Sequence, residues 1–302
     1  MTVSAGAWTA AWRRFWFAPS SPVDLGASRA LFFGGLLAWH GPQDFGVWGD
    51  VSPVFWEPVW LFYQLDLRPP PASIVLVLAW VWRCALASAA LGCFTRTSSA
   101  VAFVLGTYLL GLPHSFGKLS HTAGAVVLIL GVLAVSRSGD AVSLDALRRG
   151  RRRPVAASGE YTWPVRAAWL VLAMVFLGAG ISKLRHPGLA WVTSDTLRNT
   201  FLVNHYYQSV DQPLVPWGLT IAEYPWLCHL LAAGTVVIEM AYPVAMFAPA
   251  ARLPLVAAGV GLLLAFRVFL GPSFLALVIC HVFWVPWERL LAGFRRPRGV
   301  DG

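Results

Sequence analysis

A lysine at the end of an apolar segment is the residue of this chain most able to do chemistry. The sequence runs Val175-Phe-Leu-Gly-Ala-Gly-Ile-Ser-Lys183, and Lys183 is one of only two lysines against twenty-one arginines. A lysine at a membrane helix end commonly extends its ammonium to the interface. Where protein buries it instead, burial favours the neutral amine, which can act as a base. Lys183 therefore has two open interpretations, an anchor or a general base.

Other ionisable residues also interrupt or border apolar runs. Exposing such groups to lipid would be costly, so they are expected to face protein. One carboxylate among several arginines predicts at least one buried pair, and we expect Glu239 to contact an arginine. A contact with Lys183 would instead connect the acid to the lysine site. A packing network that fixes helix register explains these charges as well as catalysis does. The residues concerned are His121, Arg29, Arg83, Glu239 and Arg267.

The composition predicts a multi-pass protein of the cell membrane with the lipid bilayer as its main partner. Hydrophobic residues make up 57% of the chain and charged residues 12%, and the mean hydropathy is +0.63. Soluble domains carry about 25% charged residues. The net charge of +9 does not indicate nucleic-acid binding, because most arginines lie in short segments between apolar runs. No histidine or cysteine spacing predicts a metal site.

The predicted fold class is an all-α polytopic integral membrane protein without a soluble domain. Arginine distribution places both termini in the cytoplasm and puts the segments 114–121 and 183–186 on the same, outer side. Residues 1–22 would form an interfacial N-terminus with an amphipathic helix at 6–17, residues 23–291 the transmembrane domain, and residues 292–302 a basic cytoplasmic tail. The apolar runs predict about eight transmembrane helices, over residues 24–41, 72–93, 98–113, 120–135, 164–183, 226–248, 253–270 and 273–291.

Four segments resemble, in the same order, the transmembrane part of the vitamin K-dependent γ-carboxylase family, whose wider bacterial relatives are called HTTM-domain proteins. Gly178-Ala-Gly-Ile-Ser-Lys183-Leu is similar to the family's Ala-Gly-Val-Lys-Lys-Leu stretch. The resemblance covers roughly residues 20–290. The other segments are Ser21-Pro22-Val-Asp-Leu-Gly-Ala-Ser-Arg29, Leu91-Gly-Cys-Phe-Thr-Arg96-Thr-Ser, and Ser120-His121-Thr followed by Ser136-Arg-Ser-Gly-Asp140 and Ser143-Leu-Asp145.

The resemblance implies a catalytic site with Lys183 as base and His121 as its functional histidine. It implies a reduced quinone, similar to vitamin K hydroquinone, as cofactor, and we expect Arg29, Glu239 and Arg267 to contact it. No metal is expected. In the family's enzymes a histidine stands at the position of Arg267, and an arginine does not shuttle protons at ordinary pH.

Three functions stay open at this stage. The first is a quinol-dependent enzyme similar to a carboxylase or epoxidase, acting on a secreted peptide or a small molecule through an outward-opening intramembrane site. In that case Lys183→Ala should abolish activity and leave folding intact. The second is a non-enzymatic helper for the maturation or export of a secreted peptide. The third is a small transporter that uses the intramembrane charges.

Overall fold

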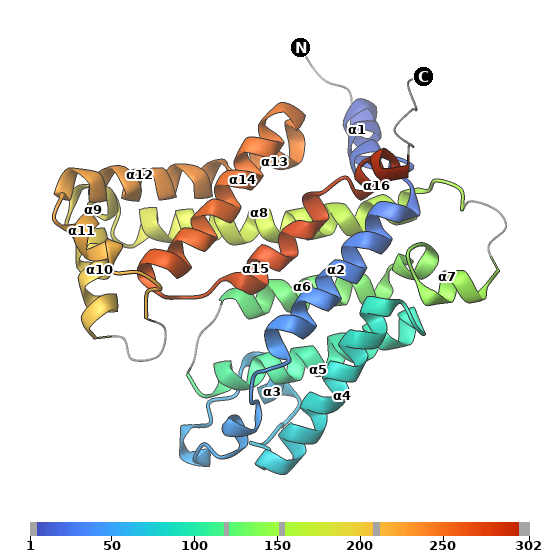
Figure 1. Cartoon of the computed structure of the whole chain (residues 1–302), viewed down its shortest axis with the longest axis horizontal. Helices are drawn as coiled ribbons and strands as arrows, with labels where there is room; N and C mark the ends of the chain where they lie inside the picture. Colours follow the sequence, from blue (N-terminus) through green and yellow to red (C-terminus); the bar gives the residue numbers. More distant parts are fainter. Residues whose placement is uncertain (1–4, 118–120, 151–154, 208–211, 296–302) are drawn as a thin grey trace, which may run out of the picture. The chain divides into compact units, whose positions relative to one another are not determined.

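The structure is a computed structural model that describes residues 5–117, 121–150, 155–207 and 212–295 (Figure 1). Of these, it leaves out the side chains of Ala5, His121 and residues 293–295. The described residues are mainly helical and contain no β-strand, apart from one isolated bridge between Ser20 and Ser158. The all-α fold class is therefore confirmed. The chain divides into two compact units, residues 1–168 with 282–302 and residues 169–281.

Three helical segments are long and apolar enough to cross a membrane by their length and composition. They are Ala72–Leu91, Gly159–Arg185 and Pro249–Leu270. Three further apolar helices are shorter, namely Thr122–Val135, Pro225–Ala241 and Leu275–Trp284. These helices support a membrane protein, while the number of spans and the side on which each terminus lies stay predictions.

The first unit is built around a layer of long apolar helices. Helix α4 packs against both α2 and α5, and α5 packs against α6, as Figure 1 shows. Ser21 caps the start of α2 with its hydroxyl, and Pro22 occupies the first helical position. Gly92 ends α4 in the left-handed conformation, with φ +69°. The helices are α1 (Ala5–Phe17), α2 (Pro22–His40), α3 (Trp60–Gln64), α4 (Ala72–Leu91), α5 (Thr95–Ser115), α6 (His121–Val135), α7 (Leu144–Arg148), the start of α8 (Thr162–Arg185) and α16 (Trp287–Arg295).

The second unit contains the end of α8 and the helices that follow it. Residues 184–225, which lie between two predicted spans, fold into three short helices that the sequence did not indicate. They enclose an apolar cluster with Leu197, Phe201 and Cys228 at its centre. The helices are α9 (Ala190–Thr193), α10 (Thr196–Tyr206), α11 (Trp217–Ala222), α12 (Pro225–Ala241), α13 (Val244–Phe247), α14 (Pro249–Ala265) and α15 (Leu275–Cys280), with a π-helical turn at Phe266–Leu270.

The prediction of one continuous helix over residues 273–291 is wrong. Helix α15 ends at Cys280, a 3₁₀ turn follows over His281–Trp284, and α16 begins only at Trp287. Pro286 explains the break, because proline has no backbone N–H to donate and its ring collides with the preceding helical turn. The helix predicted at residues 6–17 is present as α1, with Trp8 and Trp12 exposed.

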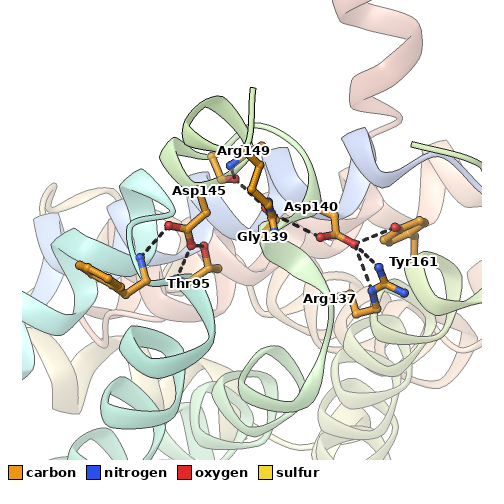
Figure 2. Close-up of polar contacts among 10 residues, drawn as sticks. Thr95, Arg137, Gly139, Asp140, Asp145, Arg149 and Tyr161 are labelled. Carbon is orange, nitrogen blue, oxygen red and sulfur yellow. Dashed lines mark hydrogen bonds and ion pairs between the residues drawn. The ribbon is translucent and has the colours of Figure 1, made fainter. Parts of the chain in front are cut away.

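Two aspartates fasten the segment after α6 to the rest of the first unit (Figure 2). The carboxylate of Asp145 accepts hydrogen bonds from the backbone N–H groups of Phe94 (3.0 Å) and Thr95 (2.7 Å), and from the Thr95 hydroxyl (2.7 Å). It thereby caps the start of α5 from a distant part of the sequence. Asp140 accepts from the Tyr161 hydroxyl at 2.9 Å and pairs with Arg137 at 2.9 Å.

These bonds make the protonation of Asp145 part of the stability of the first unit. Burial raises the pKa of this carboxyl, but hydrogen bonds from Thr95 and Phe94, with the charge of Arg149, outweigh burial and hold it below the ordinary value of 3.8. A carboxyl whose pKa is lower in the folded protein than in the unfolded chain stabilises the fold fully at pH values above its unfolded pKa. That stabilisation is lost as the pH falls through the folded-state pKa.

We therefore expect Asp145→Asn to destabilise the protein near neutral pH and to matter less in acid. Thermal unfolding of both proteins between about pH 6 and about pH 2 measures this. The difference between their melting temperatures should shrink as the pH falls below 3.8. A difference that stays constant over this range would show that the charge of Asp145 contributes nothing.

Candidate functional site

Lys183 and Glu239 form a two-point ion pair in the second unit. The Nζ atom of Lys183 donates to Oε1 of Glu239 at 2.7 Å and to Oε2 at 2.9 Å. From the sequence we expected Glu239 to contact an arginine. The structure corrects this, because its partner is Lys183. The acid and the lysine singled out from the sequence therefore belong to one site.

The pair depends on the close approach of α8 and α12. Lys183 lies in the last turn of α8, and Glu239 lies near the end of α12. Gly180 lies one turn before Lys183 on the same face of α8. A Cβ atom at Gly180 would come within 2.9 Å of Sδ of Met240 and 3.2 Å of Cβ of Glu239. The missing side chain allows the two helices to come close enough for the ion pair to form.

Both charges are largely withdrawn from the surface. The side chain of Glu239 is 3% exposed and that of Lys183 is 17% exposed. The indole ring of Trp191 lies over the ammonium, with 5.3 Å between Nζ and the ring centroid, which is within the range of a cation–π contact. A buried ion pair is stabilised by mutual attraction but carries a large desolvation penalty. The pair is consequently weak support for a purely stabilising role.

Beyond the pair, on the same face of α8 and α12, Phe176 and Tyr242 belong to a cluster of three buried rings. The rings of Phe176 and Tyr242 stack with centroids 4.0 Å apart and planes 7° apart. The imidazole of His281 meets both rings edge-on, at centroid distances of 6.1 Å and 6.0 Å. All three side chains are buried, at 3%, 0% and 6% exposure. These three side chains pack the interior of the second unit.

The structure gives Arg29 and Arg267 protein partners of their own. Arg29 is fully buried in the first unit, and its guanidinium donates to the carbonyls of Gly26, Ala89 and Val142. Arg267 lies in the π-helical turn of the second unit and donates to the carbonyls of Gln212 (2.7 Å) and Gly271 (2.8 Å). Each arginine therefore connects backbone segments. Their predicted contact with a cofactor stays a prediction.

The side chain of His121 lies outside the described residues, so its predicted place beside Lys183 also stays a prediction. Trp191 is the residue of the site whose role the sequence did not reveal. It is eight positions from Lys183 in the chain, and only the fold of α9 brings its ring over the ammonium. Among the described residues, no group of three or more His, Cys, Asp or Glu side chains could hold a metal ion.

Comparisons of the chain with protein-family models, with curated proteins and with solved structures found no match. The family resemblance in the sequence therefore enters the functional argument only as a proposal.

Proposed function

We propose that the protein is an HTTM-type, multi-pass protein of the cell membrane, and that Lys183 and Glu239 act together as a base toward the hydroxyl of a reduced quinone. The observation that carries the proposal is the two-point ion pair between these side chains, at 2.7 and 2.9 Å, with Glu239 3% exposed. A lysine and a carboxylate in direct contact can move a proton between them, and buried ionisable groups within membrane spans are functional candidates by default.

The pair explains how a charged lysine can accept a proton. Nζ hands one of its protons to Oε1 of Glu239 along the 2.7 Å hydrogen bond. Nζ would then carry a lone pair able to accept the proton of a ligand hydroxyl, leaving Glu239 as a neutral carboxylic acid and Lys183 as an ammonium. That ammonium would stabilise negative charge on the ligand oxygen, and the low exposure of the pair would strengthen this attraction.

The surroundings of the pair are compatible with an apolar ring ligand. Trp191 covers the ammonium on one side, and Lys183 retains 17% exposure through which a ligand could reach Nζ. The bound reduced quinone would supply a weakly acidic hydroxyl and, after losing its proton, electrons for dioxygen. Coupling to a secreted peptide or small-molecule substrate is part of the same proposal and rests on the family resemblance.

Oxygen-dependent turnover of an added hydroquinone by the purified protein tests the proposal. General acid–base catalysis contributes about 10²–10⁴-fold to rates, so Glu239→Gln should lower turnover by about 100-fold or more. Glutamine keeps the size of the side chain and an oxygen that accepts from Lys183, but it cannot take the proton. Arg185→Gln is the matched control, because it removes a positive charge from the exposed end of the same helix.

A further inference from the structure

The loop that joins α2 to α4, residues 41–71, lines a half-open cavity that the proposed function does not use. The cavity measures about 460 Å³ and lies between Trp56 and Pro69. Known small-molecule pockets have volumes of about 300–1,000 Å³. The sequence marks this segment only by its aromatic residues and by the run Arg68-Pro-Pro-Pro71.

The apolar side of the cavity is held firmly by α5. Phe62 is 2% exposed, and it fits against Gly111, where a Cβ atom would come within 2.7 Å of the Phe62 ring. Trp56 stacks on Phe62, with 6.2 Å between centroids and planes 20° apart, and meets Phe116 edge-on at 5.1 Å. The loop backbone is fixed as well, because the Glu57 N–H donates to the Ser115 carbonyl at 2.8 Å. The aromatic wall is therefore formed before any ligand arrives.

Two opposite charges line the same cavity without neutralising each other. Asp66 and Arg68 both border it, and neither forms an ion pair with any described residue. Both backbones are constrained. Asp66 adopts a left-handed conformation with φ +48°, which aspartate tolerates better than most residues. Arg68 precedes proline, which restricts it to extended conformations.

The combination selects for a ligand that carries both charges. An anion would be attracted by Arg68 but repelled by Asp66. A cation would be attracted by Asp66 but repelled by Arg68. A zwitterion satisfies both, with its phosphate or carboxylate on the guanidinium and its ammonium on the carboxylate. Tyr63 and Trp56 add aromatic faces, which attract an ammonium group. We propose that this cavity binds a zwitterionic group that pairs an ammonium with a phosphate or carboxylate, such as the phosphoethanolamine head group of a phospholipid.

Native mass spectrometry of the full-length protein with added phosphatidylethanolamine and phosphatidylglycerol tests the proposal. The wild type should bind phosphatidylethanolamine about tenfold more tightly, since phosphatidylglycerol lacks the ammonium that Asp66 would accept. Arg68→Gln should weaken phosphatidylethanolamine binding about tenfold. Asp66→Asn should bring the two lipids to similar affinity, and asparagine also tolerates the left-handed backbone.

Two exposed residues outside the cavity supply matched controls, Asp50→Asn in the same loop and Arg96→Gln. Both should bind as the wild type does. If soluble glycerophosphoethanolamine competes with the lipid, the free zwitterion suffices for binding. If it does not compete, the ligand is the whole lipid. Equal binding of both lipids by the wild type would overturn the proposal. So would unchanged binding in Arg68→Gln and Asp66→Asn.

Discussion

Replacing Lys183 with methionine should lower the free energy of unfolding by about 3–5 kcal/mol, the usual effect of removing one partner from a buried ion pair. Methionine keeps most of the volume of lysine, so little of the loss would come from a cavity. Glu239, at 3% exposure, would be left with a buried charge and no cation. The sequence alone predicted that Lys183→Ala would fold normally, and its contact with Glu239 reverses that expectation.

Two buried thiols of the second unit report this loss. Cys228 is 1% exposed and Cys280 is 0% exposed, so a thiol-reactive fluorophore labels them only as the second unit unfolds. Cys84 and Cys93, which are more accessible, should be replaced by serine or alanine in every protein compared. The temperature at which labelling begins should fall clearly in Lys183→Met.

The double variant Lys183→Met/Glu239→Leu separates a lost pair from lost packing. It removes both charges and keeps apolar side chains of similar size, a change that is often neutral or stabilising for buried pairs. Its labelling temperature should lie well above that of Lys183→Met. If both variants lose the same stability, the charge of Glu239 is not what destabilises the single variant.

Replacing Arg29 with leucine should destabilise the first unit by about 3 kcal/mol or more, because a buried polar group without a partner costs about 1–3 kcal/mol. Arg29 is 0% exposed, and its guanidinium serves carbonyls on α2, at the end of α4 and in the segment after α6. Leucine would remove this donor from all three carbonyls, and the Ala89 carbonyl would keep the Gly92 N–H, at 3.2 Å, as a partner. Gly92 packs directly against the guanidinium, since a Cβ there would reach 2.3 Å from it.

Unfolding followed by tryptophan fluorescence measures this second loss, with Trp82 fully buried in the same unit. Arg96→Leu makes the same chemical change at an exposed position and should shift stability by no more than about 0.5 kcal/mol. Similar stability of the Arg29 and Arg96 variants would show that the three carbonyls find other partners, such as water.

The positions of the long helices could be predicted because apolar runs end at strong local signals. Ser21-Pro22 and Gly271-Pro272 each mark a boundary in both the sequence and the structure. The helices inside residues 184–225 were missed because α10 carries no long apolar run, and only the cluster around Phe201 stabilises it.

Lys183 and Glu239 could be singled out from the sequence, but their contact could not. The rarity of Lys183 and the isolation of Glu239 in an apolar run were visible in the sequence. Their contact was not, because 56 positions separate them and several arginines were equally plausible partners. Likewise, nothing in the spacing of Asp145 and Thr95 indicates that the Asp145 carboxylate caps the helix that begins at Thr95. Such contacts depend on how helices pack, which residue type alone does not determine.

Oxygen-dependent hydroquinone turnover in wild type, Glu239→Gln and Arg185→Gln tests most directly whether Lys183 and Glu239 form a base. Turnover should be measured below the temperature at which thiol labelling begins in any of the three proteins, so that all of them are folded. The account predicts turnover by the wild type and Arg185→Gln, and a rate lower by about 100-fold or more in Glu239→Gln. Equal turnover by a folded Glu239→Gln, or none by the wild type, would contradict it.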